Sequence, residues 1–208
     1  MRVKVCGMRE ARNIAEIAGL TPDYMGFIFY EGSPRFAGSL APESLDILSP
    51  TTKRVGVFVN APIDYILKTT ERYGLNLVQL HGAESPEFCA ALRKKTGIIK
   101  AFGIGTADDF QNVEQYEGSC DYYIFDTKTS NHGGSGCKFD HNLLHKYTGR
   151  TPYLLSGGLA AEDANLLLAL KDDRCIGFDI NSRFETAPGI KDPLQVKIFI
   201  KTIKNRQK

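Results

Sequence analysis

The feature that most constrains this chain is an eightfold alternation of short apolar runs with longer amphipathic ones. Each short run is continuously apolar, as expected for a strand of a parallel sheet that is covered on its outer face. The eight runs are Val3–Cys6, Tyr24–Phe29, Arg54–Val59, Leu75–Leu80, Ile98–Ile104, Asp121–Asp126, Pro152–Leu155 and Ile176–Ile180. Between them, helical 3.6-residue periodicity is found in Arg9–Ala18, Ser85–Lys95, Ala161–Leu170 and Asp192–Ile203.

The number of these units predicts the fold. Eight strand–helix units in 208 residues average 26 residues each, which suits a compact (β/α)8 barrel. A doubly wound open sheet is the alternative, but it more often has about five or six strands. We therefore expect an α/β chain folded as a (β/α)8 TIM barrel, with residues 1–208 as a single catalytic domain. In such a barrel, functional residues lie where strands end and loops begin.

Composition excludes several classes of protein. A formal net charge of +2 is too balanced to indicate a nucleic-acid or membrane partner. No apolar run approaches the roughly 18 residues of a membrane span, and the N-terminus lacks the apolar segment of a signal peptide. The 5 cysteines are odd in number and have no C-x-x-C spacing, which argues against a disulfide framework or a zinc ribbon. These features predict a soluble, cytoplasmic chain.

Polar residues and glycines follow the predicted strands. They are Cys6, Ser33-Pro34-Arg35, Asn60, Gln79 and His81, Gly103, Asp126, Ser156-Gly157-Gly158 and Asn181-Ser182. One polar residue after a strand is usually only a loop residue. Their recurrence at eight strand ends predicts a rim that binds a polar ligand.

The loops after the seventh and eighth strands commonly bind phosphate in such barrels, through backbone N–H groups. We therefore predict a phosphate site at Gly157, Gly158, Asn181 and Ser182, with two tight turns as the alternative. A second glycine cluster, Gly133–Gly136, is interpreted as a mobile loop over the site, or as a plain connector.

Cys6 and Asp126 are candidates for proton transfer between adjacent carbons, as a base and an acid on different sides of one mouth. The thiol would need a nearby cation or helix N-terminus, and the carboxyl would need partial burial or a neighbouring negative charge to stay protonated. Each residue also has a structural explanation, because a buried cysteine packs as a small hydrophobe and aspartate often caps a turn. His141 and His145 have i, i+4 spacing without a third ligand, so no metal site is predicted.

Several segments together resemble the phosphoribosylanthranilate isomerases of tryptophan biosynthesis. In the order of that family, they are KVCGM (Lys4–Met8), GFIFYEGSPR (Gly26–Arg35), VGVFVN (Val55–Asn60), VQLHG (Val78–Gly82), FDT (Phe125–Thr127) with GGSG (Gly133–Gly136) and Phe139, LLSGGL (Leu154–Leu159) and ETAPGIKD (Glu185–Asp192). The matching pieces extend from residue 4 to residue 192, and they are specific as a set.

The resemblance implies the third step from chorismate in tryptophan biosynthesis, an Amadori rearrangement that needs no metal or organic cofactor. It implies that Asp126 protonates the ribose ring oxygen and that Cys6 removes the proton from the C2 carbon. Arg35 would bind the anthranilate carboxylate and His81 would lie near the substrate. The resemblance also implies a small phosphorylated substrate, bound by the phosphate loops named above. We expect a monomer or a weak homodimer.

The chain departs from the family pattern at two positions. Arg183 replaces a glycine of the second phosphate loop, and His141 stands where tryptophan is frequent. Two other barrel enzymes are alternatives: an epimerase would need a His/Asp metal set at the strand ends, and a histidine-pathway isomerase would be expected to have aspartate in place of Cys6. A non-catalytic metabolite-binding protein would tolerate the loss of Cys6 and Asp126.

Overall fold

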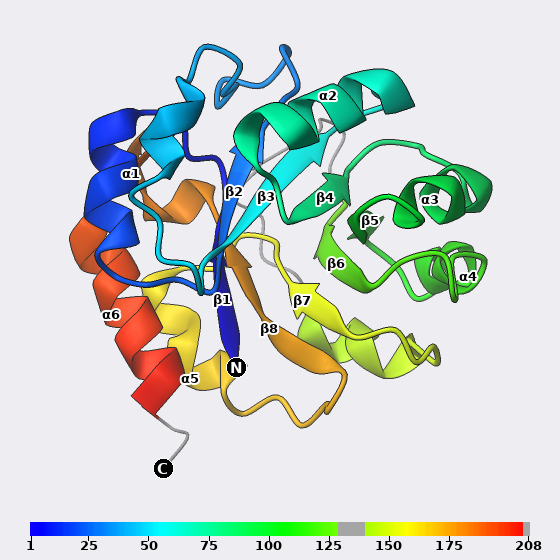
Figure 1. Cartoon of the computed structure of the whole chain (residues 1–208). Helices are drawn as coiled ribbons and strands as arrows, with labels where there is room; N and C mark the ends of the chain where they lie inside the picture. Colours follow the sequence, from blue (N-terminus) through cyan, green and yellow to red (C-terminus); the bar gives the residue numbers. More distant parts are fainter. Residues whose placement is uncertain (129–139, 206–208) are drawn as a thin grey trace.

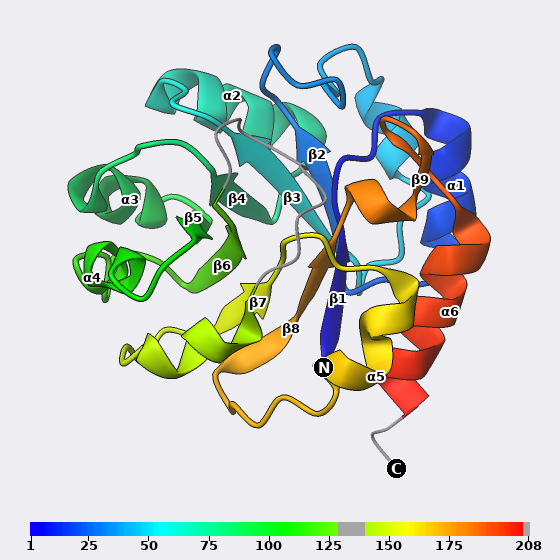
Figure 2. The same cartoon turned by 180° about the vertical axis from the view of Figure 1, so that it is seen from behind.

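The computed structural model describes residues 1–128 and 140–205, and in it eight parallel strands close into a barrel in chain order. The predicted (β/α)8 fold is confirmed (Figures 1 and 2). The strands are β1 (Arg2–Val5), β2 (Tyr24–Ile28), β3 (Lys53–Phe58), β4 (Leu77–Leu80), β5 (Gly97–Ile104), β6 (Tyr122–Thr127), β7 (Tyr153–Leu155) and β8 (Cys175–Ile180). The ring is closed by β1 and β8, where Lys4 lies opposite Asp179.

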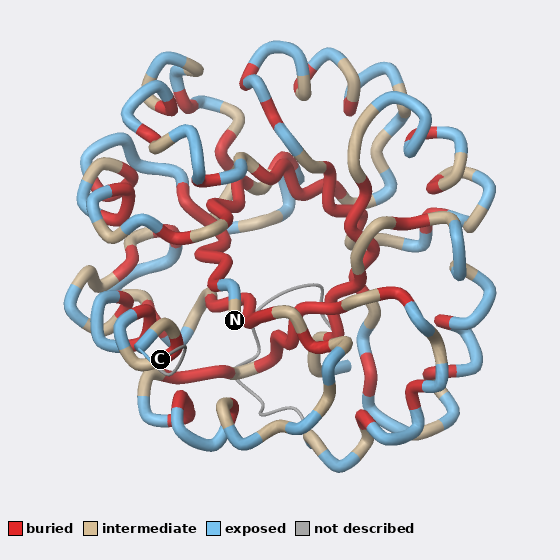
Figure 3. The backbone as a smooth tube through the Cα atoms, turned by 60° about the horizontal axis from the view of Figure 1, so that its bottom comes forward, coloured by how far each residue is buried: buried red, intermediate tan, exposed pale blue. Residues whose placement is uncertain are grey.

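Helices and helical turns cover the outside of the ring (Figure 3). They are α1 (Ala11–Ala18), η1 (Pro42–Leu45), α2 (Ile63–Tyr73), α3 (Pro86–Arg93), α4 (Asp109–Glu114), η2 (His141–Lys146), η3 (Ala161–Asp163), α5 (Ala164–Leu167), η4 (Ser182–Phe184) and α6 (Pro193–Lys204), where η marks a 3₁₀ helix. Pro86 and Pro193 begin α3 and α6, and Ser85 and Asp192 cap the first turns of these helices with their side chains.

The predicted helix Ala161–Leu170 is wrong as a single α-helix. It divides into η3 and α5, and its last turn tightens, because the N–H of Ala169 donates to Leu166 O and that of Leu170 to Leu167 O. The connections from β2 to β3 and from β6 to β7 likewise contain the 3₁₀ helices η1 and η2 among the described residues. Apolar spacing over so few residues fits an α-helix and a 3₁₀ helix equally well.

A small antiparallel hairpin follows β8 and was not predicted. It consists of β9 (Glu185–Ala187) and β10 (Ile190–Lys191), with Gly189 at φ +84° in its turn. Strands of two or three residues are too short for a periodic signal. Asn13 of α1 attaches the hairpin to the barrel, since its side chain donates to Lys191 O at 2.8 Å and accepts from Lys191 N at 2.7 Å.

The inside of the barrel has an apolar layer below a charged one. Six buried side chains form the apolar layer: Tyr24, Val55, Ile99, Ala101, Ile124 and Leu154. Further along β1 and β8 toward the strand ends, the interior contains the side chains of Lys4 and Asp179. A second, larger core fills the space between the strands and the surrounding helices. Within residues 1–128 and 140–205, no helix has the length and hydrophobicity to cross a membrane.

Candidate active site

The thiol of Cys6 lies at the end of the barrel where the strands end. Cys6 directly follows β1, one residue beyond the end of the strand, and its N–H continues the ladder by donating to Ile180 O at 2.9 Å. The side chain rests against β2, because a Cβ built on Gly26 would lie 2.8 Å from Sγ. Glycine at this position makes the room that the thiol occupies.

Asp126 lies in β6, with a carboxyl group that is 23% exposed. Its Oδ1 accepts a hydrogen bond from the N–H of Thr127 at 2.8 Å, and its Oδ2 lies 3.9 Å from Nε2 of His81. The amide nitrogen of Gln79 is 3.2 Å from the other ring nitrogen of His81. With that amide as the donor, a neutral His81 carries its proton on Nε2, the atom that faces Asp126. The sequence placed both residues at this rim.

A buried ion pair acts on both Cys6 and Asp126. The ammonium group of Lys4, with no exposed side-chain surface, donates to both carboxylate oxygens of Asp179 at 3.0 Å. Lys4 and Cys6 are two residues apart, so they point to the same side of the chain, toward the barrel interior. The charges of Lys4 and Asp179 shift the pKa of both Cys6 and Asp126.

The surroundings shift these two pKa values upward. Burial raises the pKa of Asp126 to about 6, helped by the negative charge of Asp179 and opposed by the Thr127 amide and by Lys4. Burial also raises the pKa of the Cys6 thiol, against the lowering effect of Lys4. The negative charge of Asp179 raises it further, and Lys191 lowers it. At neutral pH the thiol is therefore predominantly protonated, whereas only a minority of the Asp126 carboxyl groups keep their proton.

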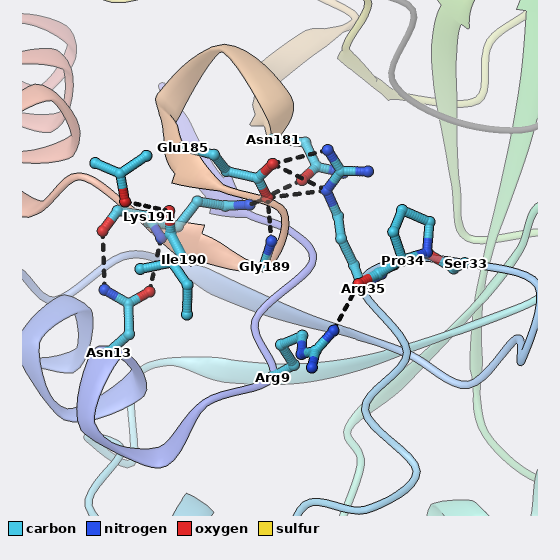
Figure 4. Close-up of polar contacts among 11 residues, drawn as sticks. Arg9, Asn13, Ser33, Pro34, Arg35, Asn181, Glu185, Gly189, Ile190 and Lys191 are labelled. Carbon is cyan, nitrogen blue, oxygen red and sulfur yellow. Dashed lines mark hydrogen bonds and ion pairs between the residues drawn. The ribbon is translucent and has the colours of Figure 1, made fainter.

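Arg35 is held by a network from the β9–β10 hairpin (Figure 4). Its Nε donates to Oε1 of Glu185 at 2.8 Å, and its Nη2 donates to Oε2 at 2.7 Å. Lys191 donates to the same Oε1 and, at 2.8 Å, to Oδ1 of Asn181. Nη1 of Arg35 has no hydrogen bond to any described residue. Glu185 therefore fixes one edge of the guanidinium group and leaves the other edge to meet a ligand.

Gly7 explains the glycine of the KVCGM segment. Its φ is +79°, and a Cβ there would lie 2.7 Å from Cδ of Arg35 and 2.8 Å from Oδ1 of Asn181. A side chain at this position would displace both groups and would strain the backbone.

The two predicted phosphate loops have free backbone donors. The N–H groups of Gly157, Gly158 and Ser182 donate no hydrogen bond within residues 1–128 and 140–205. Backbone conformation alone also favours glycine at positions 157 and 158, because their φ angles are +91° and +61°. Arg183 is exposed. The cluster Gly133–Gly136, interpreted above as a mobile loop, lies outside the described residues.

Four charged residues of this site were not singled out from the sequence: Lys4, Asp179, Glu185 and Lys191. Two of them could have been found from their position in the sequence, because Lys4 and Asp179 interrupt the apolar strand runs VKV and FDI. Charged residues are almost never fully buried unless they are paired, so a lysine and an aspartate in neighbouring buried strands indicate a pair. No group of three His, Cys, Asp or Glu side chains in the described part of the chain has the geometry of a metal site.

The fold and site define a class of protein: (β/α)8 enzymes with a thiol, a carboxyl group and anion-binding donors around one mouth. The particular family follows from comparison with known proteins. A family model described as N-(5'phosphoribosyl)anthranilate (PRA) isomerase matches residues 3–202, and the chain belongs to that family.

Known phosphoribosylanthranilate isomerases are similar to this chain over nearly its whole length, in sequence and in structure. The N-(5'-phosphoribosyl)anthranilate isomerase of Parabacteroides distasonis is 46% identical over 206 residues, which cover 98% of this chain and 93% of the relative. A solved phosphoribosyl anthranilate isomerase in complex with reduced 1-(o-carboxyphenylamino)-1-deoxyribulose 5-phosphate has a TM-score of 0.83 at 32% identity, covering 99% of both chains. Monomers derived from the dimeric enzyme of Thermotoga maritima have a TM-score of 0.82 at 32% identity, again covering 99% of both chains.

The contact between Gly26 and Cys6 gives a first prediction. Gly26→Ala places a methyl group 2.8 Å from Sγ and 3.1 Å from Cα of Cys6, so the thiol must shift. A shift of about 1 Å near a reacting group costs on the order of a hundredfold in rate. We expect kcat to fall at least about tenfold while the chain stays folded, as measured by turnover and thermal melting.

Gly19→Ala is the matched control, because Gly19 ends α1 at φ −60° and a Cβ there meets its nearest atom at an ordinary 3.5 Å. Full activity of Gly26→Ala would show that the position of the thiol does not matter.

Proposed function

We propose that this chain converts N-(5-phosphoribosyl)anthranilate into 1-(2-carboxyphenylamino)-1-deoxy-D-ribulose 5-phosphate, with Asp126 as general acid and Cys6 as general base. The chain is an isomerase of the tryptophan-biosynthesis family identified above. One observation carries the assignment of the two roles: a thiol and a raised-pKa carboxyl group lie at one mouth, and both respond to the same buried ion pair.

The proposed binding mode uses the two ends of the site. The phosphate of the substrate accepts hydrogen bonds from the backbone of Gly157 and Gly158 and from the loop of Asn181 and Ser182. At the other end, the free edge of Arg35 binds the anthranilate carboxylate, in a bidentate geometry that a guanidinium group favours. His81, beside Asp126, faces the sugar between these two ends.

The proposed chemistry moves two protons. Asp126 gives a proton to the ribose ring oxygen, the C1–O bond breaks, and the anthranilate nitrogen and C1 form an iminium group. Cys6 then removes the proton from C2, where the neighbouring positive charge makes a modest base sufficient. The resulting enolamine tautomerises to the ketone. One proton enters at the ring oxygen and one leaves C2, so the overall change is an isomerisation.

Removal of either group tests these roles. We expect Asp126→Asn and Cys6→Ala each to lose more than about a hundredfold in turnover, the usual contribution of a positioned acid or base. The assay is the loss of fluorescence of freshly made phosphoribosylanthranilate. Cys175→Ala is the control, because this buried thiol lies at the opposite end of β8. A variant of Cys6 or Asp126 with near-full turnover would exclude that residue from its role, and retained turnover in both would favour a different pair of groups.

The pKa shifts predict the pH profile. The reaction needs a thiolate and a carboxylic acid, but in the empty site the thiol has the higher pKa and Asp126 the lower, at about 6. At a pH between these two pKa values, the fraction of enzyme with both a thiolate and a carboxylic acid is constant. The fraction with a thiolate rises with pH by the same factor by which the fraction with a protonated Asp126 falls. We expect kcat/KM to form a plateau that falls below about pH 6 and again above the ordinary thiol value of about 8.5.

A pH titration of kcat/KM checks this profile, with Asp126→Asn as the control. Without the carboxyl group the compensation disappears, so the residual rate of Asp126→Asn is expected to rise with pH through neutrality. A wild-type rate that keeps rising from pH 6 to pH 8 would contradict the two assignments.

Arg35 gives a third test of this function. Its hydrogen bonds to a carboxylate are worth about 1.5–3 kcal/mol, so Arg35→Ala is expected to raise KM for the anthranilate substrate at least about tenfold. Arg12→Ala, in an 84% exposed side chain of α1, is the control. Steady-state kinetics that show equal KM and kcat for Arg35→Ala and the control would reject the carboxylate contact.

We further infer the setting in which the enzyme works. The four described cysteines are free and buried, which suits the reducing cytoplasm. The eight strands of one closed ring draw on the chain from Arg2 to Ile180, which supports a single catalytic domain. A phosphorylated small molecule is the proposed partner, and the enzyme is proposed to act as a monomer or a weak homodimer.

A further inference from the structure

The ammonium group of Lys4 is a fully buried cation near the reacting groups. Its side chain has no exposed surface, and both oxygens of Asp179 lie 3.0 Å from Nζ. The pair joins neighbouring positions of β1 and β8, the two strands that close the barrel. Cys6 is two residues further along β1, so its thiol faces the same interior space, at the open side of the pair.

We propose that Lys4 is a positioning residue for the reaction: held by Asp179 beneath Cys6, its ammonium group supplies the positive charge against which the thiolate of Cys6 forms. This inference rests on the proposed function, in which Cys6 is the base. It assigns a role to a side chain that lies one layer below the substrate and makes no contact with it.

Several charged groups surround the thiol, and they come from different strands. Lys4 is on β1, Asp179 on β8 and Lys191 on β10, while Asp126 of β6 and Arg35 complete the mouth. Lys191 already donates to Glu185 and Asn181, and burial lowers its pKa. Arg35 is bound by Glu185. Lys4 lowers the pKa of Cys6 more strongly than Lys191 does, and it is therefore the cation best placed to serve the thiolate.

Lys4 also keeps its charge. Burial lowers its pKa, but Asp179 and the neighbouring Cys6 outweigh that effect, so the pKa of Lys4 lies above its ordinary value. A carboxylate that accepts two hydrogen bonds from one ammonium group both holds that group in place and keeps it protonated. Asp179 thus has two opposite effects on the thiol: it raises the pKa of Cys6 directly and lowers it indirectly, by fixing Lys4.

Loss of this cation has a measurable consequence. Lys4→Met removes the positive charge, so the pKa of Cys6 rises and fewer molecules contain the thiolate. On the plateau of the pH profile, kcat/KM falls tenfold for each unit by which the thiol pKa rises more than that of Asp126. Lys4 lowers the pKa of Cys6 both by its charge and by a hydrogen bond, whereas it lowers the pKa of Asp126 only by its charge and as the smallest of the causes, so the effect on the thiol dominates.

Lys100 provides a matched control. It is a second buried lysine in a barrel strand, β5, with Nζ 3.3 Å from Oε2 of Glu84 and 2.8 Å from Gly82 O. Its side chain contacts the rings of Phe102 and Tyr116 on the helix side of the sheet. Lys100→Met therefore breaks a buried ion pair of the same kind without removing a charge from the mouth.

The experiment measures the thiol without using turnover. Wild type, Lys4→Met, Lys4→Arg and Lys100→Met react with iodoacetamide at pH 6–10, and mass spectrometry of the peptide that contains Cys6 gives the alkylation rate at each pH. We expect the midpoint to rise by at least about one unit in Lys4→Met, and to stay within about 0.3 units of wild type in Lys4→Arg and Lys100→Met. Plateau kcat/KM is expected to fall by about tenfold in Lys4→Met alone.

An unchanged alkylation midpoint in folded Lys4→Met would overturn the proposal, and so would an equal shift in Lys100→Met. If Lys4→Met does not fold, Lys4→Gln takes its place, because its amide keeps a donor for Asp179 while the positive charge is lost: the midpoint of Cys6 is again expected to rise, and no change or a fall counts against the proposal. Turnover of Cys6→Ala tests the proposed function separately from the role of Lys4. If Cys6→Ala retains turnover, the base lies elsewhere, whereas the alkylation midpoints still report whether Lys4 controls the thiol.

Discussion

The ion pair between Lys4 and Asp179 is the interaction on which the rest of the site depends. It bridges β1 and β8 inside the barrel, directly above the apolar layer, at the seam where the ring closes. Burial of two charges costs several kcal/mol for each ion, so such a pair adds little net stability. Its position instead determines the electrostatics of the mouth, because the same two charges act on the thiol of Cys6 and on the carboxyl group of Asp126.

The mouth as a whole is prepared for an anion. Three cations, Lys4, Lys191 and Arg35, are balanced by two carboxylates, Asp179 and Glu185. When Asp126 is in its acid form, one positive charge is in excess, and the free backbone N–H groups of the loops after β7 and β8 add to it. Because each cation is held by a carboxylate, the guanidinium and ammonium groups are ordered before a ligand arrives, and little side-chain entropy remains to be lost on binding.

Much of this protein could be predicted from its sequence. The repeated apolar runs specified a barrel because the number of strands and the spacing between them are local properties. The strand-end rule then brought Cys6, Asp126, His81 and Arg35 to one rim without any distance being known. The hairpin β9–β10 and the 3₁₀ turns gave no comparable signal, since two or three residues contain no period. Glu185 and Lys191, which order Arg35, were therefore visible only as part of a resembling motif.

The sequence by itself determined the class of fold, the rim on which the chemistry occurs and the residue types available there, since these follow from periodicity and chain order. Only the tertiary structure decided which charge faces which. Lys4 and Asp179 are 175 positions apart along the chain, and Arg35 and Glu185 are 150 apart, whereas a pKa depends on distance and burial in space. Barrel closure sets both quantities, and through them it sets the protonation of the thiol and of the carboxyl group.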